Sequence, residues 1–296
     1  MSTAYHKPVL GPEAVDLLSP GEGGLYLDGT VGGGGHAVLI LERCSGCRLL
    51  AVDRDPDALD AARVRLAPHR DRVRFLLARF DAATDDVEVR DRGLDGALLD
   101  LGISSHQVDR DERGFSFRHG TPLDMRMTPQ GPTAADLLNQ GDEAELARIF
   151  REYGEEPRGR ALAREVVRRR QETPFATSDD LVAALYRTLR REPTHQEKAR
   201  VFQALRMAVN SEMEALENAL EGIREALNDG GVLVVIAYHS LEDRMVKHAF
   251  REWSRSCVCP PGFPICTCRG RALGETLTRK PVRAGDDEVT RNPRAR

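Results

Sequence analysis

Five short apolar runs, each closed by turn residues, recur along the chain. They are GLYLDGT (24–30), CRLLAVDRD (47–55), RVRFLLARF (72–80), LDGALLDLG (94–102) and GGVLVVIAYHS (230–240). Their length and continuous apolar character are typical of buried strands of a parallel sheet. Helical patterns at 36–44 and 56–69 separate the first runs. The resulting β-α-β-α order predicts an α/β fold.

The fourth and fifth runs are separated by about 130 residues, where a single crossover helix would suffice. We therefore predict that residues 108–212 form an inserted domain and that 1–107 and 213–296 form the sheet domain. The segments 133–154, 157–171 and 177–191 carry apolar residues at helical spacing behind Thr, Pro or Ser. These patterns predict a helical insertion.

The segment 201–227 predicts one long helix that packs on the sheet, because its apolar residues form a single stripe. A coiled-coil dimer seam is the alternative. The stripe consists of Phe202, Leu205, Val209, Met213, Leu216, Leu220, Ile223 and Leu227.

Composition narrows the class of protein. The chain has 296 residues, a net charge of −4 and no apolar run near the length of a membrane span, so we expect a cytoplasmic protein without a membrane partner. Six cysteines without a secretory signal favour thiols or a metal over disulfides. The negative net charge means that any nucleic-acid surface must be a local patch.

The glycine-rich stretch DGTVGGGGHA (28–37) follows the first predicted strand. Glycines at such a position let the backbone approach a ligand, and the following helix offers free N–H groups. Gly32, Gly34 and Ala37 match the dinucleotide-binding spacing, and Asp53 ends the next strand, where a carboxylate can bind ribose hydroxyls. A dehydrogenase that binds NAD and a tight turn without a ligand are the alternatives.

Asp28 distinguishes between these ligands. A carboxylate just ahead of the glycines would repel a pyrophosphate but suits a cationic ligand, such as the amino-acid part of S-adenosylmethionine. Asp100 ends the fourth strand, at the edge where open α/β sheets bind ligands, although a strand-end aspartate can also merely cap the following turn. We therefore favour a methyl donor over NAD.

The sequence resembles the bacterial 16S ribosomal RNA cytosine-N4 methyltransferase family, known as RsmH or MraW. The matching blocks cover nearly the whole chain in the family's order. They are HKPVL, DGTVGGGGHA, AVDRDPDA, LLDLGISSHQVDRDERGFSFRHGTPLDMRM, IFREYGEEPRGRALAREVV, FQALRMAVNSE, VIAYHSLEDRMVK and RNPRAR. Ala37 replaces the usual Ser, and Tyr238 the usual Phe.

The resemblance implies a class I, Rossmann-like methyltransferase that depends on S-adenosylmethionine and carries an inserted helical domain. Its implied target is the N4 of a cytosine in the decoding centre (P site) of 16S ribosomal RNA, with the assembled small subunit as the expected substrate. A monomer and a homodimer both remain open. The implied donor-binding residues are Gly34, Gly35, His36, Asp53, Phe80, Asp100 and Gln107. From the residues alone, His36 is equally a helix-start residue and Phe80 equally a core aromatic.

The exocyclic amine of cytosine is a poor nucleophile, so polar acceptors must bind its protons. Candidates are Asp100, Asp124, and His239 with Ser240. We hypothesise that Asp100 orients the amine and the donor and that His239 lies close to the target base. Asp124 alternatively pairs with Arg126 or Arg118, and Ser240 with Asp243 has the spacing of a helix start.

Arginines in the insertion are the candidates for an RNA phosphate track, although a solvated helix face explains such runs as well. They are Arg158, Arg160, Arg164, Arg168, Arg169, Arg170, Arg187, Arg190 and Arg191. Phe115, Phe117 and Tyr238 are candidates for stacking on a splayed-out base, with core packing as the alternative. A non-catalytic module that binds RNA or ribosomes on a dinucleotide-type fold remains the rival function.

Two C-x-C pairs, Cys257 with Cys259 and Cys266 with Cys268, flank a proline-rich turn. Four thiolates can bind a structural zinc, but C-x-C is less usual than C-x-x-C in zinc sites. We expect no metal and keep zinc as the alternative. Cys44 and Cys47 form a C-x-x-C without a second pair, which favours an ordinary loop.

Overall fold

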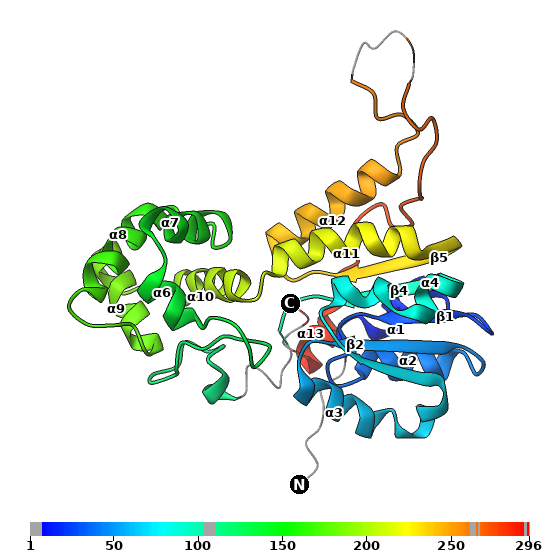
Figure 1. Ribbon diagram of the computed structural model, residues 1–296, viewed down its shortest axis with the longest axis horizontal. Coiled ribbons are helices and arrows are strands. Elements are labelled where there is room, and N and C mark those ends of the chain that lie inside the picture. Colours follow the sequence, from blue (N-terminus) through cyan, green and yellow to red (C-terminus); the bar gives the residue numbers. More distant parts are fainter. Residues whose placement is uncertain (1–7, 104–109, 261–264, 266, 293–294, 296) are drawn as a thin grey trace. The chain divides into compact units, whose positions relative to one another are not determined.

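The computed structural model describes residues 8–103, 110–260, 265, 267–292 and 295. The chain divides into two compact units (Figure 1). The sheet unit comprises Met1–Asp53, Asp57–Gly102 and Leu216–Arg296, and the helical unit comprises Arg54–Pro56 and Ile103–Ala215. Within the described ranges, none of the helices combines the length and the apolar character needed to cross a membrane.

A five-stranded sheet in the order β3-β2-β1-β4-β5 forms the centre of the sheet unit, and every pairing is parallel. All five predicted strands are confirmed. They are β1 (Leu25–Asp28), β2 (Arg48–Asp53), β3 (Val73–Leu77), β4 (Leu94–Asp100) and β5 (Leu227–Ile236). The predicted Rossmann-like α/β class is therefore confirmed.

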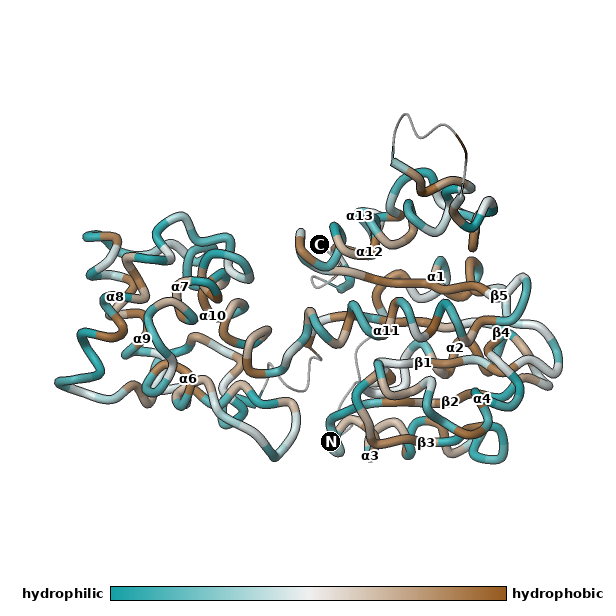
Figure 2. Tube along the Cα trace, turned by 45° about the horizontal axis from the view of Figure 1, so that its top comes forward, coloured by the Kyte–Doolittle hydropathy of each residue, from teal (hydrophilic) through white to brown (hydrophobic). Residues whose placement is uncertain are grey.

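Alternation along the strands gives the sheet two apolar faces. Leu25 and Leu27 join one core, which also contains Leu99, whereas Tyr26 between them joins a second core with Leu98. Since successive strand residues point to opposite faces, both faces need a cover of helices. Figure 2 shows much of the sheet in brown, while the helices mix brown and teal turns.

Helices α1, α2 and α3 contribute to the core on the face of Tyr26, and α4, α11 (Glu212–Ala226) and α12 contribute to the core on the other face. The predicted helices at 36–44 and 56–69 correspond to α2 and α3, with a 3-10 turn completing the second. The bounds in this unit are α1 (Gly11–Leu18), α2 (Gly35–Arg43), α3 (Pro56–Arg65), α4 (Val87–Arg92), α12 (Ser240–Trp253) and α13 (Asp286–Arg291), with 3-10 helices Ala67–Arg72 and Phe80–Asp85.

The helical unit has a separate apolar core, centred on Phe150 and Phe175. Capping boxes at Thr133, Thr177 and Thr194 begin three of its helices. The pattern at 133–154 forms two helices, because the chain breaks at Gly141 and a new helix begins there. The bounds are α6 (Ala134–Gln140), α7 (Glu143–Glu152), α8 (Gly159–Arg170), α9 (Ser178–Leu189) and α10 (His195–Val209), with a 3-10 turn at Asp111–Arg113.

The prediction of one long helix over 201–227 is wrong. Helix α10 ends at Val209, Ser211 has φ +49°, and α11 runs over Glu212–Ala226. The apolar stripe consequently serves two cores: Phe202 and Leu205 are buried in the helical unit, whereas residues of α11 are buried in the sheet unit. Because these side chains fill the interior of the two units, the stripe is not a dimer seam.

Asn210 explains the break. Its buried side chain accepts a hydrogen bond from the Met127 N–H (2.9 Å) and donates to the carbonyls of Met125 (2.7 Å) and Arg206 (2.8 Å). Its own carbonyl accepts a hydrogen bond from the Arg54 guanidinium (2.8 Å). The Asn210 side-chain amide thus provides hydrogen-bond partners for backbone groups of an irregular loop, which are not paired with a strand.

We expect Asn210→Ala to lower the free energy of unfolding by about 2–4 kcal/mol, because it leaves the Met127 N–H and the Met125 carbonyl buried without partners. Equilibrium urea denaturation measures the loss. Asn228→Ala, at an exposed residue that donates to Asp95, is the matched control and should stay within about 0.5 kcal/mol of the wild type. Equal effects of both substitutions would contradict the assigned role of Asn210.

Candidate active and cofactor site

Three aspartates lie at the carboxyl edge of the sheet, at the ends of its three central strands. Asp28 ends β1, Asp53 ends β2 and Asp100 ends β4. Asp28 is level with Ala51 of β2 and Leu98 of β4, so each neighbouring strand extends two residues further before its aspartate. Parallel pairing therefore gathers the three side chains at one edge, where α/β sheets bind ligands.

The glycine turn lies directly above this edge. Gly32 (φ +49°) and Gly34 (φ +76°) adopt left-handed backbone conformations, and Gly34 caps α2, which begins at Gly35. The Gly32 N–H donates to Asp53 Oδ2 (2.9 Å), so the aspartate predicted to bind ribose also holds the turn. A left-handed backbone favours glycine, which explains two of the four consecutive glycines.

Phe80 lies beside the same turn. A Cβ at Gly29 would come within 2.5 Å of the Leu99 side chain and 3.2 Å of Phe80 Cβ. Phe80 is half-buried and begins a 3-10 helix rather than ending a strand. It packs partly against the apolar core, so the two interpretations of Phe80, core and ligand contact, are both compatible with its place.

Asp28 is almost completely buried, with 1% of its surface exposed. Its Oδ1 accepts a hydrogen bond from the Thr30 N–H (3.2 Å), while Oδ2 is buried without a hydrogen-bond partner among the described residues. Burial, with the negative charges of Asp100 and Asp53, raises the pKa of Asp28 to about 8. The neutral acid is therefore the main form at pH 7.

The sequence analysis treated Asp28 as an ionised carboxylate that repels pyrophosphate, and this assumption is wrong for the protein without a ligand at pH 7. At pH 7 and without a ligand, Asp28 carries little charge. A cation placed beside it would favour the ionised form and draw the proton away. The preference for a cationic ligand therefore depends on Asp28, Asp53 and Asp100 together. Binding of the cation would be accompanied by release of the Asp28 proton.

Asp100 is held from three directions. Its backbone N–H donates to Thr30 Oγ1 (2.6 Å), the Tyr238 hydroxyl donates to Oδ1 (2.8 Å), and His36 Nδ1 lies 3.6 Å from Oδ2. Partial burial raises the pKa of Asp100, and the histidine and the tyrosine hydrogen bond oppose that rise. Asp100 is therefore an oriented acceptor that joins the ends of β1, β4 and β5.

His36 occupies the first turn of α2 and is buried, with 5% of its surface exposed. Its Nε2 lies 2.9 Å from the Val9 carbonyl, which only accepts, so Nε2 is the donor. Nδ1 then faces Asp100. The structure thus brings together His36, Asp100, Asp53, Asp28 and the glycine turn with Gly34 and Gly35, as the sequence predicted for the donor site. Gln107 lies outside the described residues.

His239 caps helix α12. Its Nδ1 accepts a hydrogen bond from the Glu242 N–H (3.4 Å), and its Nε2 lies 3.0 Å from Glu242 Oε1. Buried Glu242 also accepts a hydrogen bond from the Tyr238 N–H (3.0 Å). The helix-start pattern in HSLEDR is real, but the cap is His239 rather than Ser240, and Glu242 takes the place assigned to Asp243.

Two features around Tyr238 and His239 were not predicted from the sequence. Buried Glu242 was not singled out, and the link from Tyr238 to Asp100 was missed, although Tyr238 was noted as a departure from the family's usual Phe. A hydroxyl at that position was the one available sign. Its partner could not be read from the chain because 138 residues separate the two.

Asp124 belongs to the helical unit. It pairs with Arg126 through Nε and Nη2, each at 2.8 Å, and this hydrogen bonding lowers the pKa of Asp124. The alternative interpretation of Asp124, a local ion pair with Arg126, is thus confirmed. Buried Phe115 and partly buried Phe117 pack in the helical core, which also confirms the core alternative for them. Tyr238 is 42% exposed and remains available beside Asp100.

The arginine run is less uniformly cationic than its sequence suggests. Arg168 pairs with Glu165 and Glu172, Arg169 with Asp180, and Arg191 with Glu197. Arg158 and Arg170 donate to backbone carbonyls. Much of the predicted patch is therefore occupied in holding the helices together.

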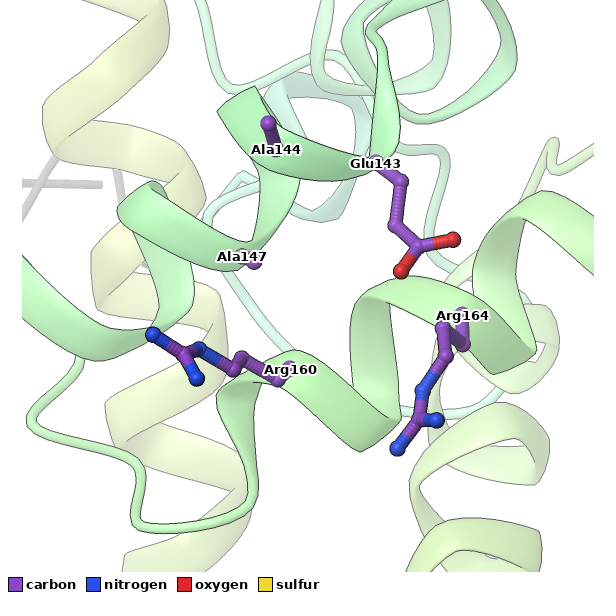
Figure 3. A pocket seen from close by; sticks show the side chains of 5 residues that line it. All are labelled: Glu143, Ala144, Ala147, Arg160 and Arg164. Carbon is purple, nitrogen blue, oxygen red and sulfur yellow. The ribbon is translucent and has the colours of Figure 1, made fainter.

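Arg160 and Arg164 have a different setting. They lie one turn apart on α8 and line a surface hollow of about 490 Å³, opposite Glu143, Ala144 and Ala147 of α7 (Figure 3). In this view the Arg164 guanidinium lies below Glu143, whereas the Arg160 guanidinium lies below Ala147. The hollow lies within the helical unit, so it is not the ligand site at the glycine turn.

The fold and the site together define a class. The protein has a parallel sheet covered by helices, a glycine turn before a helix, and aspartates at the carboxyl edge of the sheet. These are the features of Rossmann-like proteins, which bind nucleoside-type ligands at that edge. The model of the MraW methylase family matches residues 3–296, and the chain belongs to this family.

Similar proteins support this assignment. A Gemmatimonas aurantiaca protein named "Ribosomal RNA small subunit methyltransferase H" is 51% identical over 295 residues, covering 99% of this chain and 92% of that one. A protein of the same name from Symbiobacterium thermophilum is 48% identical, covering 99% and 94%. A solved rRNA methylase from Streptococcus thermophilus aligns with 33% of this chain and 58% of that chain, at 18% identity and with a TM-score of 0.27.

Asp28 generates a prediction about stability. Its native pKa lies above that of an unfolded aspartate, so the native state binds the extra proton between the two values. Raising the pH through this window therefore destabilises the native wild type, and Asp28→Asn removes the penalty. The stability of Asp28→Asn relative to wild type should grow between pH 5 and about 8 by up to about 1.4 kcal/mol per pH unit, then level off.

Urea denaturation at several pH values measures this difference. Asp71→Asn, at a side chain that is 92% exposed, is the matched control and should show no trend over the same range. A difference for Asp28→Asn that stays constant from pH 5 to 9 would show that Asp28 is ionised in the native protein.

Proposed function

We propose that this protein transfers a methyl group from S-adenosylmethionine to the exocyclic N4 of a cytosine in the decoding centre of 16S ribosomal RNA. Its relatives named small subunit rRNA methyltransferases support the substrate class. The observation that carries the choice of donor is the buried Asp28 carboxyl, whose Oδ2 has no hydrogen-bond partner among the described residues.

That carboxyl fits a cationic donor. Asp53 and Asp100 add negative charge around Asp28, so an ammonium or sulfonium group would be attracted to these acids. A dinucleotide pyrophosphate would add further negative charge at the same edge. The carboxyl edge of this sheet therefore favours S-adenosylmethionine over NAD.

The other groups of the site divide the remaining tasks. We assign the ribose hydroxyls to Asp53, the adenine to Phe80, and the backbone close to the donor to Gly34, Gly35 and His36. The bound donor supplies an activated methyl group, so the protein's main task is to hold the acceptor in line.

Asp100 is our candidate acceptor for the amine protons. Its carboxylate is oriented by Tyr238 and a quarter of its side chain is exposed, so it can both face a base and remain fixed. A carboxylate bound to the amine N–H increases the electron density on nitrogen and takes one proton as the new bond forms. Its raised pKa improves it as a base near neutral pH.

We assign recognition of the RNA to the inserted region, residues 108–212. Arg160 and Arg164 are the candidate phosphate contacts, because each lines an open hollow and neither is held by the ion pairs that occupy Arg168 and Arg169. The expected substrate is the assembled small subunit, whose folded RNA presents phosphates at fixed positions.

The test is direct. The protein is incubated with methyl-labelled S-adenosylmethionine and with small subunits that lack the modification, and the labelled nucleoside is identified by mass spectrometry after digestion. We expect the label in N4-methylcytidine. Naked 16S RNA in a parallel reaction distinguishes the two substrates. Asp100→Asn, which keeps the shape of the side chain, should lower kcat by about 100-fold or more.

Label in another nucleoside would contradict the proposed atom. No label with intact donor binding would favour a non-catalytic module that binds RNA, and tight binding of NADH without binding of S-adenosylmethionine would contradict the proposed donor.

His239 allows a separate test, because its capping role and a contact with the target base predict different results. His239→Ala removes the cap and should cost about 1 kcal/mol of stability. His239→Asn keeps a good cap residue and removes the imidazole. If His239 lies close to the base, His239→Asn should retain stability and lose methyl transfer at least about tenfold. A fully active His239→Asn variant would leave His239 with its capping role alone.

A further inference from the structure

Three cysteine thiols that the methyl-transfer chemistry does not use lie together beyond the end of α12. The Sγ atoms of Cys257, Cys259 and Cys268 are all within 4.8 Å of one another. Cys257 and Cys268 are 3.8 Å apart, much further than a disulfide bond allows. The three residues come from the two arms of one segment, drawn in orange in Figure 1.

The spacing of the sulfur atoms suits a metal ion. Zinc binds thiolates at about 2.3 Å in a tetrahedron, which places neighbouring sulfur atoms about 3.8 Å apart. The pair Cys257 and Cys268 already has this separation, and Cys259 lies within 4.8 Å of both. A small inward movement of one side chain would bring all three onto one ion.

Contacts with the end of α12 fix the two arms independently of the thiols. The Arg269 guanidinium donates to the carbonyls of Glu252 and Arg255 (2.9 Å for the latter). The Leu273 N–H donates to the Trp253 carbonyl (2.8 Å). Cys268 is thereby held beside Cys257, only four residues beyond the helix.

One of the three sulfur atoms also accepts a backbone hydrogen bond. The Val258 N–H donates to Cys268 Sγ (3.3 Å), and such a hydrogen bond stabilises negative charge on sulfur. Partial exposure leaves the group open to a metal ion.

The second cysteine pair of the chain lacks these properties. Cys44 and Cys47 are buried in the sheet unit, where Cys47 donates to the Cys44 carbonyl (3.3 Å). Burial raises the pKa of Cys47 to about 12. Cys47 therefore stays protonated near neutral pH, and the buried pair provides an internal control with the same residue type.

We propose that Cys257, Cys259 and Cys268 bind a structural Zn²⁺ that joins the two arms of the segment to the end of α12. The alternative considered for the sequence, a zinc site, thus gains support over the expectation of no metal. A fourth ligand completes a structural tetrahedron. Cys266, the sequence candidate for that place, lies outside the described residues, and the experiment decides its part.

The full-length protein, made without a histidine tag, is dialysed with Zn²⁺ and then against metal-free buffer, and its metal content is measured by mass spectrometry. We expect about one Zn²⁺ per chain. Single substitutions Cys257→Ser, Cys259→Ser and Cys268→Ser should each reduce that content to near zero, with the circular dichroism spectrum unchanged. Cys44→Ser and Cys47→Ser are the matched controls and should keep the zinc.

Replacement of Zn²⁺ by Co²⁺ gives a second readout. Tetrahedral cobalt bound by thiolates has intense visible bands and sulfur-to-metal charge-transfer absorption, and the intensity of the latter reports the number of thiolates. A spectrum that weakens in Cys266→Ser identifies a four-thiolate site, and one that does not identifies three thiolates with another ligand. Wild-type protein without zinc, an iron–sulfur absorption, or zinc that survives all three substitutions would overturn the proposal.

Discussion

Parallel pairing of β1 with both of its neighbours is the constraint on which the site depends. It fixes the level at which each strand ends, and it therefore sets Asp28 two residues below Asp53 and Asp100 at one edge. The glycine turn follows from the same geometry, because the chain must leave β1 and enter α2 within a few residues. Asp53 then secures the turn through the Gly32 N–H. A change of register would separate all of these groups.

The buried carboxyls give this edge its chemistry. Desolvation raises the pKa of both Asp28 and Asp100, while His36 and the Tyr238 hydroxyl oppose the rise at Asp100, so neighbouring acids of the same type have different surroundings. Asp28 is the more deeply buried of the two, with 1% of its surface exposed against 24% of the Asp100 side chain. Such a pair can respond to a cation at one position and accept a proton at the other, as the proposed methyl transfer requires.

The inserted helical unit shows that apolar periodicity predicts where helices begin better than where they end. Its helix starts were predictable because capping residues such as Thr133 and Thr177 act on their own helix. The break at Asn210 was not, because the apolar stripe continues through it without a change of period. What ends the helix is a set of hydrogen bonds to Met125 and Met127, which are distant in sequence and near only after folding.

The sequence by itself determined the strands, the sheet class and the glycine turn, because these follow from local alternation, turn chemistry and the ends of strands. It also supplied Asp28, Asp53 and Asp100, since strand ends can be recognised from the chain. Only the tertiary structure decided the partners of these aspartates and the raised pKa values of Asp28 and Asp100. Burial and long-range contacts set pKa values and hydrogen bonds, and both depend on which distant residues share a neighbourhood. The thiol cluster beyond α12 has the same origin: the cysteines were visible as pairs, but their separation exists only in the folded chain.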